Sequence, residues 1–137
     1  MEWVMDASVA LAWALPDENS QKADLLLNHE GSETLFHVPA LWWYEVGNAL
    51  VVAYRRKRIS ETKIFQILQL YTKLPLKTET SLTVDTVWRM CSLAREYALS
   101  VYDAAYLDLA QQLGVGLATF DRHLCSVAKK AGLKTFF

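Results

Sequence analysis

The first fifteen residues place an aspartate at the junction between a short apolar strand and a helix. The predicted strand is Trp3 to Met5, and Ser8 is the expected cap of a helix that reaches Leu15. Asp6 therefore lies at the carboxyl end of the strand. Because open α/β sheets bind their ligands at that end of the strands, Asp6 is a candidate for a functional site.

The rest of the chain alternates between short apolar stretches and longer stretches with helical periodicity. Further strands are predicted at residues 34–38, 76–78, 115–120 and 134–137. A turn is expected at 16–19, and helices at 22–30, 39–58, 60–71, 84–99, 102–113 and 121–130. This order is typical of the α/β class, with a small parallel sheet flanked by helices on both faces.

Length and composition favour one domain, residues 1–137, because 53% hydrophobic residues can bury a core of ordinary size. The net charge of -1 argues against binding nucleic acid through bulk charge, so only a local basic patch could serve. The start, with Glu2 and Asp6, does not resemble a secretory signal. No uncharged apolar run approaches the roughly 18 residues of a membrane span. A soluble, cytoplasmic protein without membrane contact is expected.

The cysteines and histidines show no ligand spacing. Cys91 and Cys125 lie in segments with helical periodicity and are expected to be reduced packing residues. His29, His37 and His123 are expected to be surface or packing residues rather than metal ligands.

A second predicted strand ends in an acid, Asp121, which is also followed by a helix. The simplest interpretation is that Asp6 and Asp121 are both helix N-caps. If the two strands are neighbours, however, each carboxylate makes ionisation of the other more costly. Two charges about 4 Å apart repel by roughly 4 kcal/mol at an effective dielectric near 20. A divalent cation would remove this penalty.

Two more acids lie in apolar helices. Glu45 is surrounded by apolar residues and needs a partner, which could be a shared cation, Asn48 one turn later, or an arginine elsewhere. Asp103 lies in the first turn of a predicted helix, where its only role could be a favourable interaction with the helix dipole. Asp108 points about 140° away from Asp103, so it is expected to be solvated or to lie behind the ligands.

These acids and their surroundings resemble the PIN-domain family, most closely its VapC-like toxin branch. The matching segments are MDASV, VPALWWYEVGNAL, VYDAAYLDLA and LATFDRHL, spread from Trp3 to Leu124. The resemblance implies a PIN-like fold and a Mg²⁺- or Mn²⁺-dependent endoribonuclease that is paired with an antitoxin. It also implies that the catalytic and metal-binding residues are Asp6, Glu45, Asp103 and Asp121, with Ser8 and Thr119 as supporting polar groups.

The residue types agree with that chemistry. Carboxylate oxygens are hard ligands that suit magnesium or manganese. A water made more acidic by the metal could attack an RNA phosphodiester bond, leaving a 5′ phosphate and a 3′ hydroxyl.

The expected macromolecular partners are RNA, a cognate antitoxin and a second copy of the chain. The run Arg55, Arg56, Lys57 and Arg58 could bind RNA phosphates or an acidic partner, or only complement the helix dipole. Trp42 and Trp43 point about 100° apart, so one of them is expected at a surface where a homodimer or an antitoxin helix packs.

Two other functions compete with a nuclease. A phosphoacceptor receiver-like domain also gathers acids at the edge of a parallel sheet, but Asp6 has no neighbouring acid and Glu45 falls inside a helix. A catalytically silent PIN-like binding module would keep the fold for its partner alone. Metal-dependent cleavage of RNA would separate these possibilities.

Overall fold

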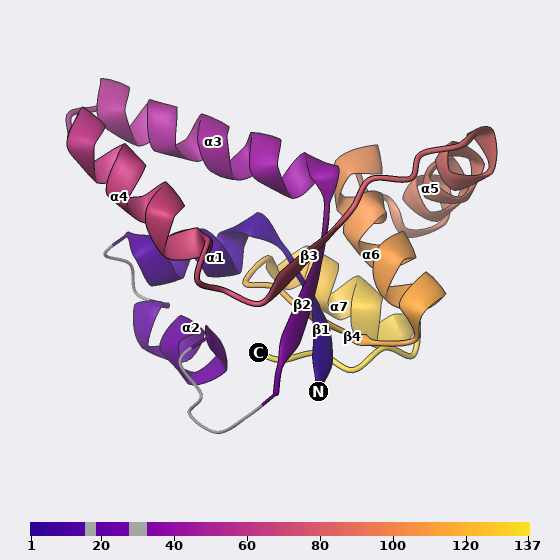
Figure 1. Ribbon diagram of the computed structural model, residues 1–137. Helices are drawn as coiled ribbons and strands as arrows, with labels where there is room; N and C mark the ends of the chain where they lie inside the picture. Colours follow the sequence, from indigo (N-terminus) through magenta and orange to yellow (C-terminus); the bar gives the residue numbers. More distant parts are fainter. Residues whose placement is uncertain (16–18, 28–32) are drawn as a thin grey trace.

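The sheet has four parallel strands in the order β3-β2-β1-β4. The computed structural model describes residues 1–15, 19–27 and 33–137. Its strands are β1 (Glu2–Met5), β2 (Leu35–Pro39), β3 (Leu76–Glu79) and β4 (Gly116–Ala118). Figure 1 shows helices on both sides of these strands. The predicted small parallel sheet with flanking helices is confirmed.

The helices form two groups. Their bounds are α1 (Ala7–Ala14), α2 (Ser20–Leu27), α3 (Ala40–Arg55), α4 (Glu61–Tyr71), α5 (Val84–Tyr97), α6 (Val101–Leu113) and α7 (Arg122–Lys130). In Figure 1, α1 to α4 lie to the left of the strands, and α5 and α6 lie to the right. Contacts join α1 to α2 and α3, and α3 to α4, while α6 contacts α5, α7 and the strands β1, β2 and β4.

The core forms where α6 and the other helices cover the central strand. All three apolar residues of β1, Trp3 to Met5, are buried, as expected for a parallel strand covered on both faces. On α6, Leu107 and Ala110 are fully buried. This packing holds the start of α6 near the carboxyl ends of the strands.

The strand order reverses at β1, which makes the site geometry possible. The chain passes from β1 to β2 on one side, and β4 returns to pair with β1 on the other side. The Asp6 N–H donates to the Ala118 carbonyl at 3.1 Å, so the two strands end side by side. Ligands of open α/β sheets bind at such a reversal point.

Several predicted boundaries were wrong. The last predicted strand, 134–137, is only an isolated bridge between Leu117 and Thr135. Beyond it, Phe136 packs edge-on against Trp3, with ring centres 5.5 Å apart, so the aromatic side chain packs inward instead of extending a strand. The strand predicted at 115–120 is β4, which is shorter.

The end of α3 and the segment after α1 also differ from expectation. Helix α3 ends at Arg55 rather than Arg58, because Lys57 has a positive φ of 59° that a helix cannot accommodate. Most of the predicted turn at 16–19, the end of the helix predicted at 22–30, and His29 lie outside the described residues.

Other expectations concern single residues and segments. Cys91 and Cys125 are both free thiols. His37 is a packing residue, buried and 2.8 Å from a carboxylate oxygen of Glu2. Within the described residues, no helix is both long enough and apolar enough to cross a membrane.

Two neighbouring helices end in the same left-handed backbone conformation with different residues. The C-cap of α6 is Gly114, with φ 67°, and the C-cap of α5 is Ala98, with φ 54°. Only glycine adopts this conformation without steric cost, because it has no Cβ atom. Ala98 is exposed, so its methyl group gains little from burial.

Ala98→Gly should therefore raise the free energy of unfolding by about 0.5–1 kcal/mol, as relief of strain exceeds the entropy lost by glycine. Gly114→Ala is the matched opposite change and should lower it by about 1 kcal/mol. No other atom lies within 4 Å of a Cβ built at Gly114, so that loss would report backbone strain alone. Urea unfolding measures both, and an Ala98→Gly protein no more stable than the parent would contradict the assignment.

Candidate active site

Asp6 is a buried carboxylate, with 6% of its surface exposed, at the carboxyl end of β1. One oxygen accepts hydrogen bonds from the Ser8 N–H at 3.1 Å and from the Ser8 hydroxyl at 2.5 Å. The Thr119 hydroxyl donates to the other oxygen. Asp6 is thus the N-cap of α1, and the prediction that Ser8 caps this helix was wrong. The extended backbone at Asp6 lets its own side chain reach the first turn.

The two hydroxyls tie the end of β1 to the segment after β4. The Phe120 N–H donates to the Ser8 hydroxyl at 3.0 Å, and the Asp121 N–H donates to the Thr119 hydroxyl at 3.0 Å. Each hydroxyl therefore accepts from the backbone of one segment and donates to Asp6. These hydrogen bonds fix the orientation of both carboxylate oxygens of Asp6 without a positively charged partner.

Burial raises the pKa of Asp6 to about 6, although the hydrogen bonds from Ser8 and Thr119 act in the opposite direction. Burial dominates because the low-dielectric surroundings disfavour the charged form. A cation at this carboxylate would favour ionisation.

Glu45 on α3 is half-buried and bound to a tyrosine rather than to an arginine. The Tyr106 hydroxyl, on α6, donates to Glu45 Oε1 at 2.5 Å. Neither of the ion pairs found in the described part of the chain includes Glu45. Asn48 is exposed, and over the same residues it forms no hydrogen bond with Glu45.

Tyr106 was not predicted from the sequence to be a site residue. It follows Asp103 by three positions, so a helix puts both residues on one face. This spacing could have indicated that Tyr106 belongs to the site, but aromatic residues at helical spacing most often belong to the core.

Asp103 and Asp121 form the second part of the site. Asp103 lies in the first turn of α6, half-buried, and Asp121 is the exposed N-cap of α7, accepting from the Leu124 N–H at 2.8 Å. Burial, and then the negative charge of Asp121, raise the pKa of Asp103. The two carboxylates are therefore close enough to repel each other.

The four acids do not converge on a single point. The charges of Glu45 and Asp6 both raise the pKa of the Tyr106 hydroxyl, so both acids lie near it. Across residues 1–15, 19–27 and 33–137, no three His, Cys, Asp or Glu side chains are close enough to hold one ion. Over the same ranges, the ion pairs are His37 with Glu2 and Arg89 with Asp108, so no ion pair neutralises the four acids.

This donor set fits a magnesium or manganese ion in its chemistry. Magnesium often binds proteins through one or two carboxylates and keeps several of its waters, so a site need not contain three converging side chains. Asp6 and Asp103, whose pKa values are raised and which form no ion pair among the described residues, would be stabilised by such an ion. The residues that could hold it are Asp6, Glu45, Asp103 and Asp121.

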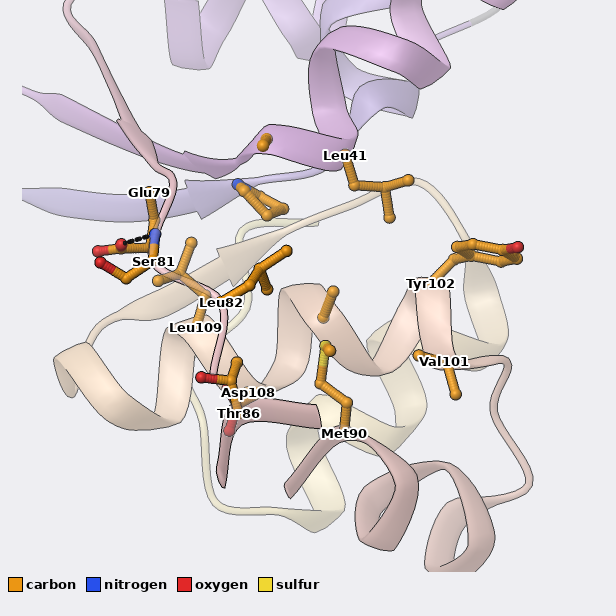
Figure 2. Close-up of a pocket in the computed structure, with 13 residues that line it drawn as sticks. Leu41, Glu79, Ser81, Leu82, Thr86, Met90, Val101, Tyr102, Asp108 and Leu109 are labelled. Carbon is orange, nitrogen blue, oxygen red and sulfur yellow. Dashed lines mark hydrogen bonds between the residues drawn. The ribbon is translucent and has the colours of Figure 1, made fainter. Parts of the chain in front are cut away.

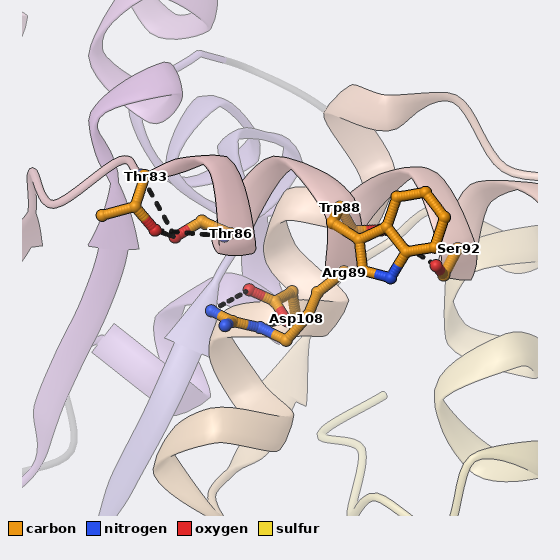
Figure 3. A network of polar contacts seen from close by, with 6 residues as sticks. All are labelled: Thr83, Thr86, Trp88, Arg89, Ser92 and Asp108. Carbon is orange, nitrogen blue, oxygen red and sulfur yellow. Dashed lines mark hydrogen bonds and ion pairs between the residues drawn. The ribbon is translucent and has the colours of Figure 1, made fainter.

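Asp108 is a structural residue, and the expectation of a solvated acid was wrong. It is buried, and it accepts from Arg89 Nε at 2.9 Å and from Arg89 Nη2 at 3.4 Å. Figure 3 shows Arg89 reaching from α5 to Asp108, beside the Thr83 and Thr86 capping box of α5. The pair joins α6 to α5 because the rotation that turns Asp108 away from Asp103 turns it toward α5.

A cavity of about 220 Å³ lies between the start of α3, the segment after β3, α5 and α6. Figure 2 shows its lining, which is largely apolar and includes Leu41, Leu82, Met90, Val101, Tyr102 and Leu109. Its one buried acid, Asp108, is already paired with Arg89. The cavity suits an apolar group rather than metal chemistry.

Basic side chains line two grooves that meet at Phe120. One groove, of about 410 Å³, includes Arg56, Arg58 and Ser8. The other, of about 570 Å³, includes Asp121 and the basic residues Lys22, Arg122, Lys129 and Lys130. Arg55 and Lys57 line a different groove, together with Tyr54 and Ile59, and Arg58 borders both this groove and the first one. The predicted basic run is thus divided, and only part of it borders the acidic site.

Comparison with known proteins identifies relatives over nearly the whole chain. The PIN domain family model matches residues 3–130. Ribonuclease VapC3 from Pyrobaculum aerophilum is 30% identical over 124 residues, which cover 90% of this chain and 92% of that protein.

Solved structures share the fold. PAE2754 from Pyrobaculum aerophilum has a TM-score of 0.67 and 24% identity, covering 99% of this chain and 90% of that one. VapC20 from Mycobacterium tuberculosis, a sarcin-ricin loop cleaving toxin, has a TM-score of 0.71 and 14% identity, covering 98% and 97%. FitAcB from Neisseria gonorrhoeae has a TM-score of 0.67 and 14% identity, covering 100% and 97%. At these identities the likeness shows the fold alone.

The raised pKa of Asp6 predicts a stability that falls as pH rises. Between the ordinary value of 3.8 and the folded value of about 6, the folded chain holds a proton that the unfolded chain has released. In metal-free buffer, Asp6→Asn should therefore raise the free energy of unfolding near pH 7 by about 1–3 kcal/mol, and the gain should shrink toward about pH 4. Asp85→Asn, on the exposed first turn of α5, is the control. Urea unfolding at both pH values measures the difference, and a gain independent of pH would contradict the assignment.

Proposed function

The chain belongs to the PIN domain family, and from that premise we propose that it is a ribonuclease toxin that cleaves RNA at the acidic site around Asp6. The observation that carries the proposal is the buried carboxylate of Asp6 at the β1–β4 reversal point, together with the mutual repulsion of Asp103 and Asp121, with no ion pair to any of the four acids among the described residues. The related ribonuclease VapC3 supports RNA as the substrate.

In this proposal, Asp6, Glu45, Asp103 and Asp121 hold Mg²⁺ or Mn²⁺. When bound, the ion supplies a more acidic water and neutralises charge at the phosphate. The chain's own part is to keep the carboxylates oriented. Ser8 and Thr119 orient Asp6 by donating to both of its oxygens, and the Ser100 cap of α6 positions Asp103.

The two basic grooves supply the complementary charge for the RNA backbone. Arg56 and Arg58 line one groove that includes Phe120, and Arg122 and Lys129 line the other. Phosphates bound in both grooves would bring an intervening phosphodiester bond to the acids. The overall charge of the chain is near neutral, so this local arrangement, and not bulk charge, would provide the RNA affinity.

The alternatives make different use of the same residues. In a receiver-like domain the phosphoacceptor carboxylate must be free to attack, whereas both oxygens of Asp6 accept hydroxyl hydrogen bonds. A silent binding module would keep the fold without cleaving RNA. The unneutralised acids favour the nuclease, because a module without a cation would retain their repulsion for no benefit.

A toxin of this kind acts in the cytoplasm and requires an antitoxin to restrain it, and we include both in the proposal. The relative Ribonuclease VapC3, which is 30% identical over 124 residues, supports this. We also propose a homodimer, with exposed apolar residues of α5, Val84 and Trp88, as candidates for the contact. The exposed member of the tryptophan pair is Trp43, which donates to the Thr78 hydroxyl at 2.9 Å, whereas Trp42 is buried in the core.

The purified protein should cleave single-stranded RNA with Mg²⁺ or Mn²⁺ and lose that activity in EDTA. Asp6→Asn and Asp103→Asn should each lower the rate at least about 100-fold, because losing a ligand removes several kcal/mol of charge stabilisation. Sequencing of the cleaved RNA should find 5′ phosphates.

Asp85→Asn removes an exposed acid on the first turn of α5 that is not one of the four site acids, and it should cleave at the parent rate. Circular dichroism checks that each variant is folded. A folded parent protein that leaves RNA intact with either metal would support the silent binding module instead.

The division of the basic run predicts unequal roles for its arginines. Replacing Arg56 and Arg58 together with serine should weaken RNA binding and reduce the salt dependence of log Kd by about two phosphate contacts. Arg55→Ser, at the same helix end but in another groove, should change both quantities little. Fluorescence anisotropy with labelled RNA at several salt concentrations measures this, and equal effects of the two changes would refute the division.

A further inference from the structure

Tyr106 brings a buried phenol into contact with Glu45 and near Asp6. Only 2% of its surface is exposed, and its hydroxyl donates to Glu45 Oε1 at 2.5 Å. The charge of Asp6 also acts on this hydroxyl, as does the backbone of Ala7 at the start of α1. The phenol oxygen therefore lies where α1, α3 and α6 meet.

Tyr71, a second buried tyrosine, provides a comparison, because its hydroxyl has only a structural role. The Tyr71 hydroxyl donates to the Ala10 carbonyl at 2.8 Å, joining α4 to α1 through a neutral backbone group. Tyr106 instead donates to a carboxylate. Such charge-assisted bonds are shorter and roughly twice as strong as neutral ones, so they restrain the acceptor side chain more strongly.

The restraint matters because Glu45 is a flexible, half-buried side chain on a different helix from Asp103. Tyr106 and Asp103 lie three positions apart on α6, so one rigid helix presents both groups. The same helix is joined to α5 through the pair of Arg89 and Asp108. Through Tyr106, the position of α6 also determines where the carboxylate of Glu45 lies.

We propose that Tyr106 is a positioning residue that holds Glu45 in place for a divalent cation. The inference rests on the proposed function, in which these carboxylates bind that cation. Tyr106 needs no contact with the ion or the RNA, because it acts by limiting the orientations of Glu45. Residues that orient metal ligands in this way typically contribute 10–100-fold to metal affinity.

The test is Mn²⁺ binding to the RNA-free protein, measured by isothermal titration calorimetry. Tyr106→Phe removes a single oxygen and should raise the Kd for Mn²⁺ about tenfold or more. Tyr71→Phe is the matched control, since it also removes one buried hydroxyl, and it should leave the Kd within about twofold of the parent. Adding Tyr106→Phe to Glu45→Gln should have little further effect, because the group that Tyr106 positions is already altered.

The outcomes separate this inference from the function on which it rests. Parent protein that binds no Mn²⁺ overturns the metal site, and this inference with it. Parent protein that binds Mn²⁺ as tightly as Tyr106→Phe overturns the inference alone. A Tyr106→Phe effect that persists in full beside Glu45→Gln also overturns it, because Tyr106 would not act through Glu45.

A measurement on the unsubstituted chain covers the case in which Tyr106→Phe does not fold. With tyrosines labelled at Cζ, a Mg²⁺ titration followed by NMR should shift the Tyr106 resonance and leave that of Tyr71 in place. The Tyr71 signal is identified by its loss in Tyr71→Phe. A titration that shifts no buried tyrosine, in protein that binds Mg²⁺, would overturn the inference.

Discussion

The site depends on a buried carboxylate that the protein orients but does not neutralise. Removing a charge from water is costly, and a buried acid is usually paired with a base. Asp6 instead receives the hydroxyls of Ser8 and Thr119, which in turn accept N–H groups from the segment after β4. The ends of β1 and β4 are therefore joined around a negative charge, which a bound cation would neutralise and the hydroxyls do not.

Helix α6 brings together the other requirements of the site. Its apolar face packs on the sheet, while Asp103 and Tyr106 share one face and Asp108 projects in another direction. Asp103 faces the charge of Asp121, Tyr106 binds Glu45, and Asp108 binds Arg89. One helix thus sets the spacing of the acids and is itself held by an ion pair to α5. The ion pair of Arg89 with Asp108, which lies outside the acidic site, therefore helps to hold the helix that carries Asp103 and Tyr106.

The charge distribution also explains how a nearly neutral chain can act on RNA. Acids occupy the reversal point of the sheet, and basic groups line two grooves that share Phe120. A polyanion would be attracted by the grooves and repelled by the acids unless a cation lies between them. This combination favours binding in the basic grooves and chemistry at the acids.

The sequence by itself determined the alternating elements, the parallel sheet and the two acids at strand ends, because these follow from local periodicity and from the order of the chain. The tertiary structure alone decided which acid meets which partner. Glu45 and Tyr106 are 61 positions apart, and Arg89 and Asp108 are 19 apart. It also decided that Asp6 rather than Ser8 caps α1, and that residues 134–137 form no strand. Such contacts depend on side-chain directions that are set when helices pack, and no local pattern records them.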